Sequence, residues 1–371
     1  MRLLLVTQDY PPETGGIQSY MGHLARALRP LCEGLVVVAP RSPRADRSSV
    51  PDVPVERVRV HSSWLALPLL ASLPSLVERH RATHVLYAQW FPALAGLRLP
   101  RPVVQGCIVH GRELLNHPLG AAGLALAPGV LRRQHALFPN SAHTASLLPE
   151  GIDPTRVHVV HPGVDGDVFR PPSDADRAGL RARLGLEPGT KVVTCLTRLV
   201  RRKGVDTLLE AAALLRDRVP GVRVLVGGNG PDRPRLEERI RELSLSETVR
   251  LLGRIDDRDL PSFLSLGVFT LLSREEKRDV EGFGMVLAEA QSCGARVVAA
   301  RSGGMPEAVG PGAGRLVAPD SPAEAAAAFE EMLSSADGPG PSAEGIAFAA
   351  TLDWPSRARL LLDFLDPSAS S

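Results

Sequence analysis

The stretch Leu3-Leu4-Leu5-Val6 lies near the start of the chain, and a loop that contains Gly15 and Gly16 follows it. An unbroken run of apolar side chains is typical of a strand that is buried on both faces of a parallel sheet. Residues 18–28 then predict a helix, and residues 35–38 predict a second strand. This strand–helix–strand order indicates the unit from which doubly wound α/β sheets are built.

The same alternation continues along the chain. Further strands are predicted at 55–60, 84–87, 103–108, 136–138 and 157–160, and then at 192–197, 222–226, 249–252, 268–272 and 297–300. The stretch 166–176, which contains Pro171-Pro172, predicts a linker between the two series. We also expect a loop at 334–342 and a last amphipathic helix at 352–365.

The length of 371 residues suits two domains of ordinary size. We expect one Rossmann-like domain over 1–170, another over 171–350, and a C-terminal helix and tail over 351–371 that packs back on the first domain. The predicted fold class is α/β, with two doubly wound parallel sheets that face each other across a cleft. Ligands bind at the carboxyl ends of the strands in such sheets, so functional residues are expected there.

Composition restricts the function. With 44% hydrophobic and 23% charged residues the chain is globular, and a net charge of +2 argues against a dedicated nucleic-acid binder. Residues 1–171 carry a net +5 and residues 172–371 a net −3, so the first half suits an anionic surface or acceptor. The longest apolar stretch, 119–131, is shorter than the roughly 20 residues that span a bilayer, and no signal peptide is predicted. Four cysteines without metal-ligand spacing are expected to be buried, reduced thiols of a cytoplasmic protein: Cys32, Cys107, Cys195 and Cys293.

The segment Glu281-Gly-Phe-Gly-Met-Val-Leu-Ala-Glu289 runs from a polar loop into a predicted helix. Gly282 and Gly284 let backbone amides approach a ligand, and a helix N-terminus favours an anion. On a helix, about 1.5 Å per residue would separate the two carboxylates by about 12 Å. That separation is too long for a hydrolytic acid/base pair and suits two ends of one extended ligand. The alternative is a capping acid followed by a partly buried helix glutamate.

The segment Arg198-Leu-Val-Arg-Arg-Lys203-Gly204 directly follows the predicted strand 192–197. Arg198 and Lys203 would lie at the carboxyl end of that strand, where two fixed cations can neutralise a diphosphate leaving group. For Arg201 and Arg202 we favour a solvated basic loop.

Together, the Arg-x4-Lys and the Glu-x7-Glu resemble family 4 of the retaining glycosyltransferases, which have the two-domain GT-B fold. The resemblance covers nearly the whole chain. Supporting motifs occur in the same order: Gly15-Gly16, His110-Gly-Arg-Glu113, His161-Pro-Gly-Val-Asp165, Gly228-Asn-Gly-Pro231 and Ser302-Gly-Gly-Met-Pro-Glu307. The local sequences around Gln18 and at 278–284 are similar to those of bacterial mannosyltransferases that modify phosphatidylinositol mannosides.

The resemblance implies a role for each matching residue. Arg198 and Lys203 would bind the donor diphosphate and stabilise its departure. Glu281 would hold the sugar hydroxyls, Glu289 the ribose hydroxyls, and His110 would lie beside the anomeric carbon. The other implied donor-side residues are Gly15, Gly16, Gly228, Gly230, Arg254, Gly282, Phe283, Gly284, Met285 and Val286. The acceptor-side candidates are Asp9, Tyr10 and Gln18, and a solvated loop is their alternative.

The resemblance also implies the partners. The donor would be a nucleotide-diphosphate sugar, with GDP-mannose preferred, and the acceptor a glycolipid or saccharide hydroxyl. No cofactor and no metal are expected, because the cations of the C-terminal domain take the place of a metal. Asp165-Gly-Asp167 looks like a manganese-binding Asp-x-Asp but falls at the predicted linker. Segment 114–135, which ends near Arg132-Arg133, suits either an interfacial helix on the cytoplasmic face of an anionic membrane or a core helix with a loop.

Other functions remain as alternatives. A UDP-sugar donor is left open, because no base-reading residue can be chosen. Sugar-nucleotide epimerases share this architecture but are not expected to combine the two motifs, and a dehydrogenase would need a Gly-x-Gly-x-x-Gly after the first strand. A catalytically silent GT-B scaffold should have lost one or more of four residues that are all present: His110, Arg198, Lys203 and Glu281.

Overall fold

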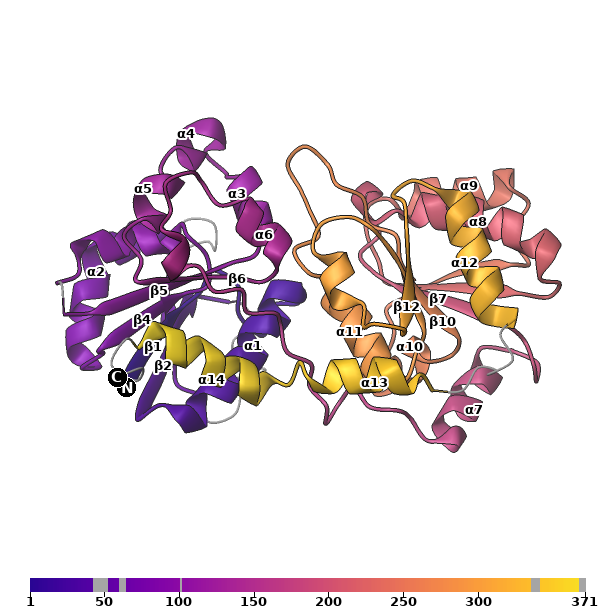
Figure 1. Ribbon diagram of the computed structural model, residues 1–371, viewed down its shortest axis with the longest axis horizontal. Helices are drawn as coiled ribbons and strands as arrows, with labels where there is room; N and C mark the ends of the chain where they lie inside the picture. The colour runs from indigo at the N-terminus through magenta and orange to yellow at the C-terminus, as the bar shows by residue number, and fades with distance from the viewer. Residues whose placement is uncertain (43–52, 60–64, 101, 335–340, 367–371) are drawn as a thin grey trace. The chain divides into compact units, whose positions relative to one another are not determined.

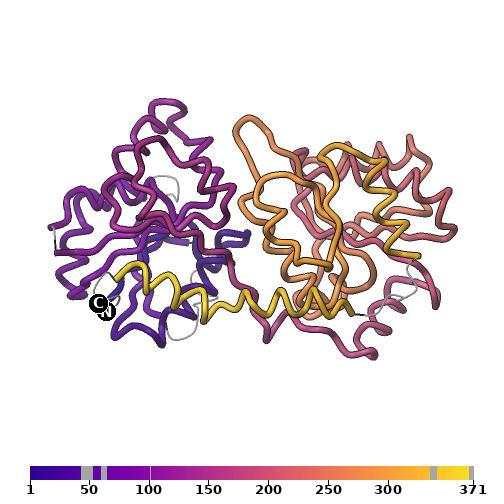
Figure 2. Tube along the Cα trace, in the orientation of Figure 1, coloured from indigo at the N-terminus to yellow at the C-terminus, as the bar shows by residue number. Residues whose placement is uncertain are grey.

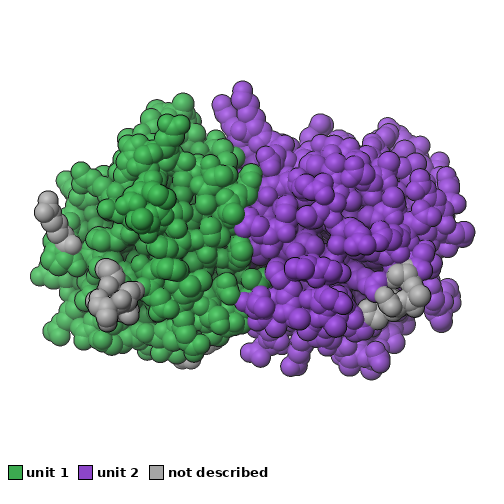
Figure 3. Space-filling model, in the orientation of Figure 1, with its two compact units in different colours: residues 1–163, 352–371 green, residues 164–351 purple. Residues whose placement is uncertain are grey.

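A computed structural model describes residues 1–42, 53–59, 65–100, 102–334 and 341–366. The chain forms two compact units (Figure 3). Unit 1 combines Met1–Gly163 with Leu352–Ser371, and unit 2 is Val164–Thr351. The chain therefore leaves unit 1 after Gly163 and returns to it at Leu352. The Cα trace in Figure 2 follows this return along the yellow C-terminal segment.

Unit 1 contains a six-stranded parallel sheet in the order β3-β2-β1-β4-β5-β6. The strands are β1 (Arg2–Val6), β2 (Gly34–Pro40), β3 (Val55–Val58), β4 (His84–Tyr87), β5 (Val104–Val109) and β6 (Ala136–Pro139). β1 lies in the middle of this sheet, and its side chains from Leu3 to Val6 are therefore at most 2% exposed. The longer helices are α1 (Gly16–Leu28), α2 (Ala66–Arg79) and α14 (Trp354–Leu365). α14 packs against α1, β5 and β6, as Figure 1 shows.

Unit 2 contains a second six-stranded parallel sheet in the order β12-β11-β10-β7-β8-β9. The strands are β7 (Val192–Leu196), β8 (Arg223–Gly227), β9 (Val249–Gly253), β10 (Val268–Leu271), β11 (Val297–Ala300) and β12 (Gly314–Val317). Its helices are α7 (Asp174–Arg183), α8 (Val205–Arg218), α9 (Arg233–Glu242), α10 (Leu260–Leu264), α11 (Met285–Ser292), α12 (Pro322–Ser334) and α13 (Ala343–Ala350). α8 and α12 pack together on the sheet, and apolar side chains such as Leu208, Leu215 and Phe329 fill this core.

Both sheets have the same topology, in which the strand order reverses between the first and the fourth strand. The reversal lies between β1 and β4 in unit 1 and between β7 and β10 in unit 2. At such a switch point the two following loops diverge and leave room for a ligand at the carboxyl edge of the sheet. Ligand-binding residues are therefore expected in the loops after β1, β4, β7 and β10.

Three sequence-based expectations about secondary structure were wrong. Residues 157–160 form no strand: Val157 makes a single bridge to Leu137 at the edge of the sheet. Segment 114–135 forms neither one interfacial helix nor one core helix with a loop, because it consists of the end of α3 (Arg112–Leu115) followed by α4 (Gly120–Leu124) and α5 (Ala127–Leu131). β12 was missed, since Gly314 and Arg315 interrupt its apolar pattern.

α11 begins at Met285, so helical spacing does not apply between Glu281 and Gly284, and the separation of about 12 Å between the carboxylates of Glu281 and Glu289 stays a prediction. Residue 60 of the predicted strand 55–60, and residues 335–340 of the predicted loop, lie outside the described residues. The four cysteines are buried free thiols. A search of the described residues finds no helix with the length and apolarity needed to cross a bilayer.

Candidate active site

The loop after β7 carries the basic segment of unit 2. It continues into a short 3-10 turn, Arg201–Lys203, and Gly204 then starts α8 in a left-handed conformation with φ 65°. A Cβ at Gly204 would collide with the carbonyl oxygen of Leu272, the residue that follows β10. Glycine therefore lets the loop after β7 lie directly against the chain after β10, its neighbour at the switch point.

This close approach brings together charged residues from the two loops. Lys203 Nζ donates a short hydrogen bond to Glu281 Oε2, and Arg202 Nη1 lies 3.1 Å from the same oxygen. Arg202 Nε lies 3.3 Å from Asp279 Oδ2. Burial alone would raise the pKa of Glu281, but the nearby Lys203 and Arg202 charges lower it to about 2. Glu281 is therefore ionised and held between two cations, and we call these four residues the Lys203–Glu281 cluster.

The neighbouring arginines differ sharply in environment. The side chain of Arg202 is only 12% exposed, so the expectation of a solvated position was wrong for this residue. Arg201 is exposed, as expected, and so is Arg198. No hydrogen bond or ion pair to the guanidinium of Arg198 is found among the described residues, which leaves it available to a ligand.

A second ionic network ties the loops of this edge together. Arg274, just after β10, pairs with Asp206 at 2.5 Å and with Asp320 at 2.9 Å. Arg235 of α9 pairs with the same Asp206 at 3.2 Å and with Asp232 at 2.6 Å. The network links the beginnings of α8, α9 and α12 to the loop after β10, so it stabilises the arrangement of the loops around the Lys203–Glu281 cluster.

The glycine-rich segment before α11 forms the other part of this edge. Gly284 caps α11 in a left-handed conformation with φ 89°, and Phe283 is 2% exposed. Gly282, Met285 and Val286 are half-buried around it. This arrangement presents the N-terminus of an eight-residue helix at the carboxyl edge of the sheet, and such an end favours an anion.

Glu289 lies in the second turn of α11. Burial raises the pKa of its carboxyl to about 7. Within the described part of the chain, no hydrogen bond or ion pair reaches this carboxyl group. Glu289 is therefore a partly buried acid without a partner among the described residues, which distinguishes it from the paired Glu281.

Two other donor-side expectations concern the loop after β8 and the end of β9. Cβ atoms at Gly228 and Gly230 would collide with the carbonyl oxygens of Thr197 and Leu199, so both glycines allow this loop to pack on the chain after β7. Arg254 is 72% exposed and lies 3.5 Å from Asp257. The glycines thus shape the edge near Arg198, whereas Arg254 lies at the solvent-exposed surface.

The switch point of unit 1 carries amides and carboxyls. Gln18 of α1 donates to Asp9 Oδ1 at 2.7 Å, and Gln89, after β4, donates to Asp9 Oδ2 at 2.7 Å. A Cβ at Gly15 would collide with Gln18 Oε1, and Gly16 is the first residue of α1. Burial raises the pKa of Asp9, against the lowering effect of the Gln89 hydrogen bond. The structure therefore brings Asp9 and Gln18 together.

Tyr10 does not share this position. We expected it to line a polar loop, but its side chain is 2% exposed, with the Arg57 guanidinium 5.6 Å from the ring centroid. Burial raises the pKa of its hydroxyl to about 12. An aromatic ring at this point contributes to the core below the loop, because its apolar area is removed from water.

His110 follows β5 and is 7% exposed. Burial lowers its pKa to about 4, although a hydrogen bond to the Ala88 backbone opposes this shift. Its backbone N–H donates to Glu113 Oε1 at 2.6 Å. Burial raises the pKa of Glu113 to about 7, and this hydrogen bond opposes that shift. His110 is thus neutral at pH 7, and its Nε2 has no hydrogen-bond partner among the described residues.

Two families match this chain, one over each half. Residues 14–168 match Glycosyltransferase Family 4, and residues 176–343 match Glycosyl transferases group 1. The chain is 35% identical over 322 residues to the GDP-mannose-dependent alpha-(1-6)-phosphatidylinositol monomannoside mannosyltransferase of Mycobacterium tuberculosis, with 83% of this chain and 82% of the relative covered. The chain therefore belongs to the same glycosyltransferase family as this mycobacterial relative.

Two further comparisons agree with this family. The GDP-mannose-dependent monoacylated alpha-(1-6)-phosphatidylinositol monomannoside mannosyltransferase of Corynebacterium glutamicum is 30% identical over 342 residues, with 85% of this chain and 84% of the relative covered. The Anabaena protein HepE, crystallised with UDP and glucose, shares the fold with a TM-score of 0.80 at 22% identity, over 98% of this chain and 99% of that chain. The expected GT-B fold is confirmed.

Three residues near the site of this glycosyltransferase were not assigned from the sequence. Gln89 and Glu113 follow β4 and β5, and the quoted His110–Glu113 motif already contained the second. Arg202 was read as solvated. Gln89 could have been predicted, because it is a polar residue directly after a strand at the switch point. Arg202 could not, because no local feature of the sequence distinguishes it from Arg201.

No metal-binding site is found in the part of the glycosyltransferase that the structure describes, where no three His, Cys, Asp or Glu side chains cluster suitably. Asp165 Oδ1 accepts a hydrogen bond of 3.1 Å from the backbone N–H of Asp167. The Asp165 side chain thus caps a local turn just after the unit boundary, which is a structural role for this Asp-x-Asp sequence.

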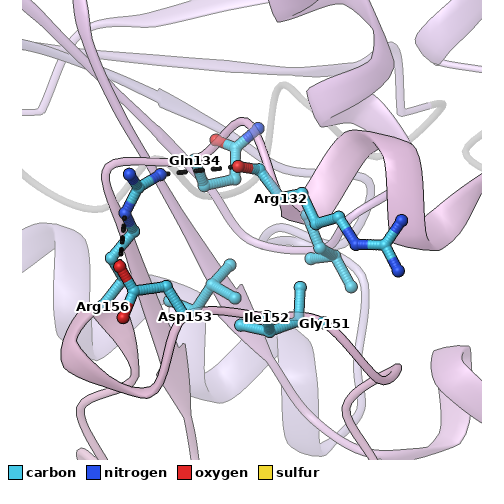
Figure 4. A pocket seen from close by; sticks show the side chains of 8 residues that line it. Arg132, Gln134, Gly151, Ile152, Asp153 and Arg156 are labelled. Carbon is cyan, nitrogen blue, oxygen red and sulfur yellow. Dashed lines mark hydrogen bonds and ion pairs between the residues drawn. The ribbon is translucent and has the colours of Figure 1, made fainter.

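A partly open pocket of about 220 Å³ lies elsewhere in unit 1 (Figure 4). Its walls come from α5, β6 and the segment Gly151–Arg156, and Arg156 pairs with Asp153 at 3.6 Å beside it. None of the expected site residues lines this pocket. The candidate site therefore consists of residues at the carboxyl edges of the two sheets and does not include this pocket.

Proposed function

We propose that this glycosyltransferase transfers mannose from GDP-mannose, with retention, to a hydroxyl of a phosphatidylinositol mannoside or a related glycolipid. The observation that carries the proposal is the Lys203–Glu281 cluster at the switch point of unit 2, next to the unpaired Arg198. The names of the relatives, which are GDP-mannose-dependent enzymes acting on phosphatidylinositol monomannoside, support the choice of donor and acceptor.

The positive side chains of unit 2 suit a diphosphate. Arg198 and Lys203 would contact its oxygens and stabilise the charge that develops as the sugar–phosphate bond breaks. The N-terminus of α11 would add backbone N–H groups of Phe283, Gly284 and Met285 to the same phosphate or to the ribose. Electrostatic stabilisation of the leaving group would supply most of the catalysis.

The two glutamates of unit 2 suit hydroxyl groups. Glu281, ionised and held by Lys203 and Arg202, would accept hydrogen bonds from the transferred sugar. Glu289 has no protein partner and would bind the ribose hydroxyls. Its carboxyl oxygens make no hydrogen bond within the described residues and so are available to ligand hydroxyls.

Unit 1 would contribute neutral polar groups. The uncharged His110 would lie beside the anomeric carbon, and its Nε2 is free to accept a hydrogen bond from a sugar hydroxyl. Asp9, oriented by Gln18 and Gln89, would bind the acceptor. The departing phosphate would take the proton of the acceptor hydroxyl on the same face, so no covalent nucleophile is assigned.

The donor can be tested by binding and by transfer. In a thermal-shift panel of GDP, UDP and ADP, we expect GDP to raise the melting temperature most, because a ligand that binds only the folded state stabilises it. Radiolabelled GDP-mannose should then label a phosphatidylinositol mannoside acceptor. A larger shift with UDP, together with transfer from UDP-glucose but not from GDP-mannose, would show that the donor is a UDP-sugar.

Metal independence is also a proposal. Arg198 and Lys203 would fill the role that a divalent cation fills in other transferases. Transfer in excess EDTA should equal transfer in added Mg²⁺ or Mn²⁺. A strict requirement for added manganese would contradict this mechanism.

Finally, we propose that unit 1 contacts an anionic membrane surface. Leu119 and Leu126, beside α4 and α5, are 45% and 44% exposed, and the exposed Arg132 and Arg133 follow α5. Apolar side chains next to arginines suit the interface of anionic lipids. The chain should sediment with vesicles that contain phosphatidylinositol and much less with pure phosphatidylcholine vesicles. Equal sedimentation with both would argue against an electrostatic contribution of the arginines to membrane binding.

A further inference from the structure

His110 belongs to a continuous row of aromatic rings inside unit 1. The Tyr20 ring of α1 meets the His110 ring edge to face, with centroids 5.1 Å apart and planes at 87°. The same Tyr20 ring meets Trp354 edge to face at 5.0 Å and 85°. His23, one turn after Tyr20 on α1, stacks on Trp354 at 5.7 Å and 12°. Such edge-to-face contacts favour one relative orientation of the rings.

Trp354 lies where the chain returns from unit 2 to unit 1. It is the first residue of α14, and Asp353 caps this helix by accepting a hydrogen bond of 2.8 Å from the Ser356 backbone. The chain returns to unit 1 only two residues before Trp354, at Leu352. The indole is 5% exposed, so it is buried directly after the second passage between the units.

The first passage meets the same indole. Gly163 is the last residue of unit 1 before the chain enters unit 2. A Cβ at Gly163 would lie 2.5 Å from Trp354 Cδ2 and 2.6 Å from Cγ, so only glycine allows the backbone to lie this close to the ring. Trp354 therefore lies against the first passage between the units and follows the second by only two residues.

We propose that Tyr20 and Trp354 are positioning residues that couple the orientation of the His110 ring to the two chain passages. Tyr20 is 3% exposed and has little room to move, so a shift of Trp354 is transmitted to Tyr20 and then to His110. The transfer step is sensitive to the placement of His110, whereas donor binding depends on unit 2. This inference rests on the proposed function, in which His110 contacts the sugar.

The experiment compares four variants of the full chain by steady-state transfer kinetics. We expect Tyr20→Leu to lower kcat by about 10–100-fold and Trp354→Leu by about tenfold, with KM for the donor within about twofold of wild type. Tyr20→Phe keeps the ring and should stay within about threefold in kcat. Leu361→Ala is the control, because Leu361 is also fully buried on α14 but belongs to none of the ring contacts.

Kinetics alone would not separate positioning from loss of fold, so a spectroscopic measurement accompanies them. The NMR signals of the His110 ring are identified by their loss in His110→Gln. They should move in Trp354→Leu as well as in Tyr20→Leu, and stay in place in Leu361→Ala. If Trp354→Leu does not fold, Gly163→Ala, which pushes on the same indole, replaces it and should move the same signals.

The outcomes are distinct. The inference is overturned if the His110 signals are unchanged in Trp354→Leu, or if Tyr20→Leu and Trp354→Leu match Leu361→Ala in kcat at equal folded fraction. If the wild-type enzyme transfers no sugar from any donor tested, the proposed function fails, but movement of the His110 signals would still support the link between Trp354 and His110.

Discussion

The carboxyl edges of the two sheets of this protein carry opposite chemistry on the same topology. In unit 2, Lys203, Arg202 and Glu281 are charged and paired, and Glu281 has a pKa of about 2. In unit 1, His110 is buried and neutral, and burial raises the pKa of Glu113 to about 7. The difference teaches that a shared sheet order favours ligand binding at the same edge, while burial and charge decide the chemistry offered there; in the proposed mechanism, unit 2 would hold the anionic leaving group and unit 1 the neutral sugar. An anionic leaving group needs fixed cations, whereas a neutral sugar needs hydrogen bonds.

The strongest test of the charged side is Lys203→Ala. Loss of the cation should lower turnover by about 10²–10³-fold, because one group that stabilises the leaving charge is removed. Lys191→Ala is a matched control, since Lys191 is exposed and lies just before β7, at the opposite end of that strand. A loss below tenfold in Lys203→Ala would remove the diphosphate assignment.

Next comes Arg202→Ala, set against Arg201→Ala. Arg202 holds Glu281 and Asp279, so its loss should lower kcat by about 10–100-fold through misplacement of Glu281. Arg201 is exposed, and its substitution should change kcat by less than about threefold. Equal effects of the two changes would mean that the paired position of Arg202 has no consequence for transfer.

The neutral side can be tested through acid stability. The pKa of His110 is about 4 in the folded state against 6.5 unfolded, so its contribution is complete above pH 6.5 and is lost as the pH falls to 4. The loss amounts to about 3 kcal/mol in the free energy of unfolding. All three tryptophans lie in unit 1, so their fluorescence during urea unfolding reports on it.

The stability difference between the wild type and His110→Gln should therefore change by this amount between pH 6.5 and 4, whereas the opposing contribution of Glu113, with its pKa of about 7, is common to both proteins. In unit 2, by contrast, the Glu281 contribution is complete above pH 4.5 and is lost as the pH falls towards 2. An unchanged slope in His110→Gln would show that His110 is not kept neutral by the fold.

The smallest expected effect is that of Gln89→Leu. Removal of one hydrogen bond to Asp9 should raise KM for the acceptor by about three- to tenfold. Donor affinity, measured by the thermal shift with GDP, should not change, because unit 2 is untouched. A change in donor affinity without a change in acceptor KM would contradict the division of roles between the units.

Much of the fold was predictable because strands and helices follow local patterns. The observed bounds of β4 and β11 equal the predicted 84–87 and 297–300, since continuous apolar runs mark buried parallel strands. The prediction at 157–160 was wrong because a short apolar run can also lie beside a sheet edge without pairing along its length. Likewise, Tyr10 is polar enough for a loop but large enough for the core, and only the surrounding residues decide between these positions.

By itself, the amino-acid sequence determined the α/β class, the two-unit organisation, and the motif residues that mark the two switch points. Those features depend on the periodicity of apolar residues and on local spacing. Only the tertiary structure decided that Arg202 joins Glu281, which is 79 positions away, or that Gln89 joins Asp9, 80 positions away. Such pairs form because the sheet order places distant loops side by side, and no local pattern in the chain encodes which of two adjacent arginines turns inward.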